Sequence, residues 1–343
     1  MRTLLDIQKH LLPDLMEVMK KRYEILHLVM LSGTVGRRVL AGSLGISERV
    51  LRAEVDFLKV QGLLDIDNSG MRISPAGKRL LQQLEPLIKE LFGLTEMEEA
   101  IKSRYGLRQV VVVPGDADNS HIAKKELGRA AAGILRKIVE ENDVIAVTGG
   151  STMAEVALWL TQTPNMKGNW FVPARGGLGE SVEFQANTIA SDMAKRTGGQ
   201  YRMLHVPDHL SEEAYQSLSQ EPNIREVVAV IRRARIVVHG IGDAIRMAKR
   251  RNSDALTLQK LREEGALAEA FGYYFNRAGQ VVHKMQTLGL RLEDIHQTEA
   301  VIAVAGGTSK GQAIAAVLRY GRENILVTDE AAAQEIIKAN GLS

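Results

Sequence analysis

A strand that breaks into glycines and hydroxyls and then continues as a helix is the feature that most constrains this chain. Residues 144–147 are an apolar, mostly β-branched run that is typical of a buried strand. Residues 148–152 read Thr-Gly-Gly-Ser-Thr, and 153–160 have a helical pattern. Glycines let backbone N–H groups approach an oxyanion, hydroxyls donate hydrogen bonds, and a helix N-terminus adds partial positive charge. The segment therefore predicts an anion site.

The same pattern recurs twice. Residues 301–310 read Val-Ile-Ala-Val-Ala-Gly-Gly-Thr-Ser-Lys, which ends in Lys310 at the start of a helix, and residues 173–177 place Arg175 before two more glycines. A single Gly-Gly pair is often no more than a tight turn. Three such segments, two of them carrying hydroxyls, favour a phosphate or phosphosugar pocket over turn chemistry alone.

Bulk composition limits the class of protein. A chain of 343 residues is too long for one small core, so we expect two domains. Cysteine is absent, which excludes disulfides and thiolate metal sites and suits a cytoplasmic protein. The N-terminus lacks the apolar stretch of a signal peptide, and no apolar run approaches the roughly 18 residues that would cross a bilayer. We expect a soluble, cytoplasmic protein that does not engage a membrane.

The net charge of +3 is localised. Residues 1–93 hold 14 Lys+Arg against 11 Asp+Glu, which accounts for the entire excess. This asymmetry is a mild indication that the first quarter of the chain binds nucleic acid.

A helix-turn-helix pattern occupies this basic quarter. Residues 13–31 form an amphipathic helix, 37–44 a second helix, and Gly45 supplies the tight turn. Ser47 is a suitable N-cap for a third helix that runs to about residue 58. The pattern predicts a helix-turn-helix fold.

The third helix has the pattern of a recognition helix. Arg49, Arg52 and Asp56 share its outer face, which could equally be an ordinary solvated surface. Two short strands at 62–66 and 71–74 follow, and their hairpin reads as the wing of a winged helix-turn-helix. We therefore favour binding to double-stranded operator DNA, with five candidate contact residues: Arg37, Arg38, Ser47, Arg49 and Arg52.

The segment after the wing marks the domain boundary. Its apolar stripe over residues 80–91 could pack on its own domain or pair with a second subunit, and Pro86 should kink or restart the helix. Residues 95–98 read as a capping box that opens another helix. We place a DNA-binding domain with its linker helix at 1–93 and a second domain at 94–343.

From residue 109 onward, strand patterns alternate with helical ones. The candidate strands are 109–113, 143–148, 169–173, 202–206, 235–239, 300–304 and 324–328. This alternation predicts a doubly wound, mainly parallel α/β sheet, whose ligands bind beyond the carboxyl ends of the strands. Residues 271–284 break the alternation with a β-hairpin pattern, which we expect to pack beside the main sheet.

Several long blocks carry a resemblance to a known family: 45–52, 147–150, 171–180, 185–188, 239–242, 269–276 and 305–307. On these blocks the whole chain closely resembles the SorC family of bacterial transcriptional repressors. The resemblance implies a winged-helix DNA-binding domain joined to an effector domain related to phosphosugar isomerases and deaminases. For this branch it also implies repression of glycolytic genes, with fructose-1,6-bisphosphate as the inducer.

The resemblance also implies an effector site. One phosphate should lie at Gly149, Gly150, Ser151 and Thr152, with Lys310 reaching across from the second Gly-Gly turn. Arg175 and Gln185 should face the sugar or the other phosphate, with Arg250 and Glu269 as further members. Ser151 stands where threonine was expected, but the hydroxyl donor is retained. We expect no cofactor and no metal, and we expect a homodimer or homotetramer.

Two alternatives stay open. A phosphosugar isomerase or deaminase would need an acid and a base at the sugar carbons, for which His239 and Asp243 are the candidates. Asp243 could equally cap the following helix, and His239 could sit satisfied inside its strand. A purely structural DNA-binding protein would leave the glycine-rich loops unexplained. We therefore expect a ligand-gated repressor without catalytic residues.

Overall fold

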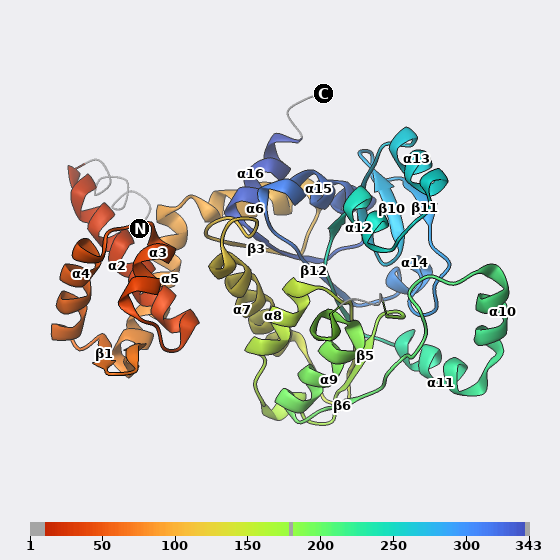
Figure 1. Cartoon of the computed structure of the whole chain (residues 1–343), viewed down its shortest axis with the longest axis horizontal. Helices are drawn as coiled ribbons and strands as arrows, with labels where there is room; N and C mark the ends of the chain where they lie inside the picture. Colours follow the sequence, from red (N-terminus) through yellow and green to blue (C-terminus); the bar gives the residue numbers. More distant parts are fainter. Residues whose placement is uncertain (1–10, 178–180, 340–343) are drawn as a thin grey trace. The chain divides into compact units, whose positions relative to one another are not determined.

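The computed structural model describes residues 11–177 and 181–339. The chain divides into two compact units, Met1–Glu96 and Met97–Ser343, each with its own core (Figure 1). None of the helices in the described ranges is both long and apolar enough to cross a membrane.

The first unit is a winged helix-turn-helix. Gly45 takes the left-handed conformation (φ 64°) that the turn requires, and Ser47 caps the third helix by accepting a hydrogen bond from the Val50 amide at 3.3 Å. Leu51, Val55 and Leu58 form the buried stripe of that helix, as the sequence pattern predicts. The elements are α2 (Pro13–Ser32), α3 (Arg37–Leu44), α4 (Glu48–Val60), β1 (Leu64–Asp67), β2 (Gly70–Ile73) and α5 (Pro75–Leu91).

The wing is an antiparallel hairpin of β1 and β2. An isolated bridge between Val35 and Met71 attaches β2 to the segment that follows α2. The prediction of the wing is confirmed. Helix α5 continues through Pro86, so the restart that we allowed there does not occur.

The predicted capping box at 95–98 is wrong. Helix α6 (Leu94–Tyr105) begins before Thr95, which therefore lies inside the helix. The Glu98 carboxylate instead accepts a hydrogen bond from the Val112 amide at 2.9 Å, and so links α6 to the first strand of the second unit.

The second unit is built on a seven-stranded, wholly parallel sheet, ordered β3-β13-β12-β7-β4-β5-β6. The predicted strand at 202–206 is wrong, because the edge strand is only Gln200–Tyr201. The strands are β3 (Gln109–Val113), β4 (Val144–Val147), β5 (Trp170–Pro173), β6 (Gln200–Tyr201), β7 (Ile236–His239), β12 (Ala300–Val304) and β13 (Ile325–Asp329).

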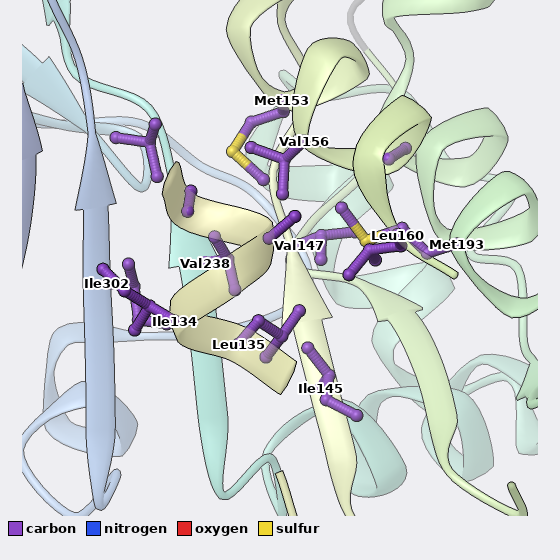
Figure 2. Close-up of a cluster of buried hydrophobic side chains, with 14 of the residues drawn as sticks. Ile134, Leu135, Ile145, Val147, Met153, Val156, Leu160, Met193, Val238 and Ile302 are labelled. Carbon is purple, nitrogen blue, oxygen red and sulfur yellow. The ribbon is translucent and has the colours of Figure 1, made fainter. Parts of the chain in front are cut away.

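Helices flank this sheet and bury its apolar strands. Side chains of α7 and α8 meet those of β4, β7 and β12 in the core drawn in Figure 2. The helices are α7 (His121–Ile138), α8 (Ser151–Trp159), α9 (Ala186–Thr197), α10 (Glu212–Gln220), α11 (Pro222–Ile231), α12 (Ala244–Arg250), α13 (Ala255–Glu263), α14 (Leu292–Ile295), α15 (Gly311–Tyr320) and α16 (Glu330–Lys338), with 3-10 turns η1 (Pro164–Met166), η2 (Val182–Phe184) and η3 (Thr308–Lys310).

The predicted hairpin belongs to a second, antiparallel sheet ordered β11-β10-β9-β8. Its strands are β8 (Gly242–Asp243), β9 (Ala266–Ala270), β10 (Tyr273–Asn276) and β11 (Val281–Lys284). The sequence patterns located β10 and β11 but not β8 or β9. Strand β9 reads Ala-Leu-Ala-Glu-Ala, a composition that favours helix over strand when taken alone.

Candidate functional site

A cavity of about 390 Å³ opens at the carboxyl ends of the parallel strands of the second unit. Its wall includes Thr148 after β4, Arg175 after β5 and Gly240 after β7, the positions at which open α/β sheets bind ligands. The structure brings together at this cavity all nine residues expected to form the effector site: Gly149, Gly150, Ser151, Thr152, Arg175, Gln185, Arg250, Glu269 and Lys310.

The N-terminus of α8 supplies free backbone donors. Gly150 has a φ of 121°, which favours glycine, and its amide donates to the Phe184 carbonyl at 2.8 Å. Among the described residues, the next three amides, those of Ser151, Thr152 and Met153, have no acceptor, and no side chain caps the helix. Three unpaired donors at the positive end of a helix dipole form an anion-binding site.

The second Gly-Gly turn differs from our expectation, because the protein's own carboxylates occupy its donors. The Gly307 amide donates to Asp329 at 2.7 Å, and the Ser309 amide donates to Asp118 at 2.7 Å. The amide and hydroxyl of Thr308 both donate to Asp116, at 3.1 and 2.9 Å. The prediction that this turn is a second anion-binding loop is therefore wrong.

The third glycine pair serves close packing. A Cβ on Gly176 would lie 2.5 Å from the carbonyl oxygens of both Val206 and Pro207, so only glycine fits there. The Gly177 amide already donates to the Val206 carbonyl at 2.9 Å. Among the described residues, the segment at 148–152 is therefore the one that presents a run of three free helix amides at the cavity.

Cationic side chains line the same cavity as the free amides of α8. Lys310 lies at the end of η3, while Lys124 of α7 and Arg246 of α12 line the same cavity. Burial, followed by the like charge of Lys124, lowers the pKa of Lys310 below its ordinary value. The Lys124 ammonium lies 3.5 Å from the Ser151 hydroxyl. An anion bound here would find countercharge within reach.

Another part of the cavity wall is a closed ring of four charges. Arg175 contacts Asp208 at 3.0 Å and Glu269 at 3.2 Å, and Arg251 contacts the same two carboxylates at 2.8 and 3.1 Å. All four side chains are at most 13% exposed. Although burial opposes ionisation, Arg251 and Arg175 keep the pKa of Glu269 below its usual value. The ring is electrically neutral and holds the arginines in place.

Sequence reasoning missed four of these residues, namely Lys124, Asp208, Arg246 and Arg251. Arg251 follows Arg250 directly, but Arg250 is exposed whereas the Arg251 side chain is only 2% exposed. The local sequence around a single charged residue does not show whether its side chain will be exposed or buried in an ion pair.

The two candidate catalytic residues do not form an acid–base pair. Asp243 caps α12 by accepting a hydrogen bond from the Arg246 amide at 2.8 Å, the structural role that we had left open. His239 is fully buried and does not line the cavity. Burial lowers the pKa of His239 to about 4 and raises the pKa of its neighbour Glu323 to about 7. Within the described ranges, no group of His, Asp or Glu side chains is arranged to hold a metal ion.

The first unit presents its candidate DNA contacts to solvent. Arg37, Arg49 and Arg52 are exposed, and Arg38 makes only a long 3.8 Å contact with Glu48. The Ser47 hydroxyl is engaged as the cap of α4.

Comparisons with known proteins agree with this architecture. Residues 18–88 match the family described as "CggR N-terminal DNA binding domain", and residues 89–338 match the family described as "Putative sugar-binding domain". A SorC family transcriptional regulator from Enterococcus faecalis has a solved structure that is 41% identical with a TM-score of 0.66, covering 71% of this chain and 99% of that one. The full-length sorbitol operon regulator SorC from Klebsiella pneumoniae shares the fold with a TM-score of 0.68 at 18% identity, covering 88% of this chain and 94% of that one. The fold and cavity thus define a transcriptional regulator with a DNA-binding and a sugar-binding domain.

Two relatives that align over nearly the whole chain show which kind of transcriptional regulator this is. The central glycolytic genes regulators of Priestia megaterium and Bacillus subtilis are 49% and 48% identical, and each alignment covers 98% of this chain and 99% of the relative. The chain belongs to the family of central glycolytic genes regulators, within the SorC family.

Proposed function

We propose that this regulator of glycolytic genes is a repressor that binds operator DNA through α4 and releases it when fructose-1,6-bisphosphate enters the cavity of the second unit. It would act in the cytoplasm as a homodimer or homotetramer and without a cofactor. The observation that carries the proposal is a single cavity that joins a free helix N-terminus to two separate groups of cationic side chains.

The first phosphate of the effector is assigned to the N-terminus of α8. The amides of Ser151 and Thr152 would donate to it, and Lys310 would supply a charge-assisted bond. The lowered pKa of Lys310 supports this assignment, because an anion beside it would relieve the unfavourable burial of its charge.

The second phosphate and the sugar hydroxyls are assigned to Arg175, Gln185 and Arg250, which line the same cavity. Arg175 is held by two carboxylates and is therefore positioned before the ligand arrives. The cavity volume of about 390 Å³ falls in the usual range for small-molecule sites, roughly 300–1,000 Å³.

Catalysis on a phosphosugar is the weaker candidate. His239 is sealed from the cavity, and Asp243 is engaged as a helix cap. The relationship to isomerases that the family resemblance implies does not by itself supply their chemistry.

One titration tests the proposal. We expect fructose-1,6-bisphosphate to release the purified protein from operator DNA, monophosphates to act only at higher concentration, and fructose to have no effect. Fluorescence anisotropy of labelled DNA measures the release. The same samples should show no conversion of fructose 6-phosphate or ribose 5-phosphate. Release by fructose alone, or steady turnover that Asp243→Asn abolishes, would contradict the proposal.

A further inference from the structure

Lys124 is held beside the N-terminus of α8 by close packing of two helices. A Cβ on Gly128 of α7 would lie 2.7–2.8 Å from backbone and Cβ atoms of Glu155 in α8, so the two helices touch where α7 has no side chain. Lys124 and Ser151 each lie one turn before this contact point, and Lys124 Nζ is 3.5 Å from Ser151 Oγ. The helix packing therefore fixes the point from which the Lys124 side chain reaches the N-terminus of α8.

This ammonium lacks a countercharge. Across the described ranges, neither Lys124 nor Lys310 forms an ion pair, and the charge of Lys124 disfavours protonation of Lys310. Of the charged groups that act on Lys310, Arg246 disfavours its protonation, while Asp118 and Asp329 favour it. Both carboxylates already accept hydrogen bonds from backbone amides, Asp118 from Ser309 and Asp329 from Gly307. Two like charges converge on a helix N-terminus that is itself positive.

We infer that Lys124 is a further ligand of the phosphate bound at the N-terminus of α8, and that it makes this end of the cavity select a dianion. The inference rests on the proposed function, since it concerns the same effector site. Two ammonium groups and three free amides balance the charge of a phosphate dianion far better than that of a carboxylate or a neutral hydroxyl.

The test replaces Lys124 in the full-length protein. Lys124→Ala should weaken binding of fructose-1,6-bisphosphate by about ten- to hundredfold, while DNA binding without effector stays unchanged. Lys125→Ala is the matched control, because it removes the same charge from the neighbouring position, which does not line the cavity. Lys124→Arg should retain most of the affinity, and Lys124→Gln replaces the alanine variant if that variant does not fold. Calorimetric titration measures the affinities.

A pH profile tests whether Lys124 acts on this end of the cavity through its charge. Since the bound anion favours the protonated form of Lys310, effector affinity should fall as the pH rises through the lowered pKa of Lys310. Removing Lys124 takes away one cause of that lowering, so in Lys124→Ala the fall should move to higher pH.

Two outcomes would overturn the inference: wild-type affinity in Lys124→Ala, or an equal loss in Lys125→Ala. If the unaltered protein binds no phosphosugar at all, the proposed function fails instead.

Discussion

At the scale of single residues, burial differs sharply between neighbouring charges. Arg250 and Arg251 are neighbours in sequence, yet only Arg251 is enclosed between two carboxylates. The family resemblance, supported by the position of each residue beside a glycine-rich segment, placed Lys310 and Arg175 at the cavity. Sequence reasoning could not place Arg251 or Asp208, because their pairing is a tertiary event between residues 43 positions apart.

The buried pair of His239 and Glu323 leads to a prediction about stability. Burial raises the pKa of Glu323 from 4.5 to about 7, so the folded state holds that proton more tightly than the unfolded chain does. The ionised carboxylate therefore destabilises the fold progressively from about pH 4.5 to pH 7, and fully above it. His239, whose pKa is lowered from 6.5 to about 4, acts in the opposite direction and destabilises the fold as the pH falls from 6.5 to 4.

Glu323→Gln should therefore stabilise the protein above pH 7, by on the order of 1 kcal/mol or more, and this gain should shrink toward pH 4.5. Chemical denaturation at several pH values measures the difference. The exposed Glu213→Gln is the control and should show no such trend. A gain that does not depend on pH would mean that the carboxyl of Glu323 is not the source of the effect.

At the scale of elements, two segments with nearly the same sequence pattern have different roles. Residues 148–152 and 305–309 both follow a buried parallel strand and both contain Gly-Gly and hydroxyls. The first leaves its helix amides free, whereas the second is filled by Asp116, Asp118 and Asp329. The pattern correctly predicted strands, turns and the sheet edge, because these depend on local periodicity and backbone freedom. The partners of the turn amides come from distant segments, so the pattern could not predict them.

Gly149, in the loop at 148–152, packs closely against the turn at 184–186. A Cβ at this position would lie 2.7 Å from the Phe184 carbonyl oxygen and 3.3 Å from the Ala186 amide, so Gly149→Ala must displace the turn that carries Gln185. We expect effector affinity to fall by at least tenfold while DNA binding is retained. Gly133→Ala in α7 is the control, because its added Cβ meets only one atom, at 3.9 Å, and alanine is the better helix former. Isothermal titration compares the two variants, and equal affinities would show that the turn adapts without consequence.

At the scale of the whole molecule, the proposed function couples two separately folded units. Coupling between two binding sites is reciprocal, so operator DNA must weaken effector binding by the same factor by which the effector weakens DNA binding. For a factor of about 5–150, the range typical of allosteric proteins, both changes are measurable.

We therefore expect the dissociation constant for fructose-1,6-bisphosphate to rise when saturating operator DNA is added. Calorimetry with and without the DNA gives both values, and a non-specific duplex is the control. Arg52→Ala on the exposed face of α4 should weaken DNA binding and leave effector affinity in the absence of DNA unchanged. Equal dissociation constants for the effector with and without operator DNA would rule out the proposed coupling.

The four-charge ring of the cavity has one further consequence for such a regulator. Asp208 and Glu269 already form ion pairs with Arg175 and Arg251, so the cavity wall contains its own competing anions. A ligand phosphate that approaches Arg175 must share the guanidinium with these carboxylates and bear their repulsion, which reduces its net gain in free energy. In the function proposed above, the ring would therefore raise the effector concentration that is needed to fill the cavity.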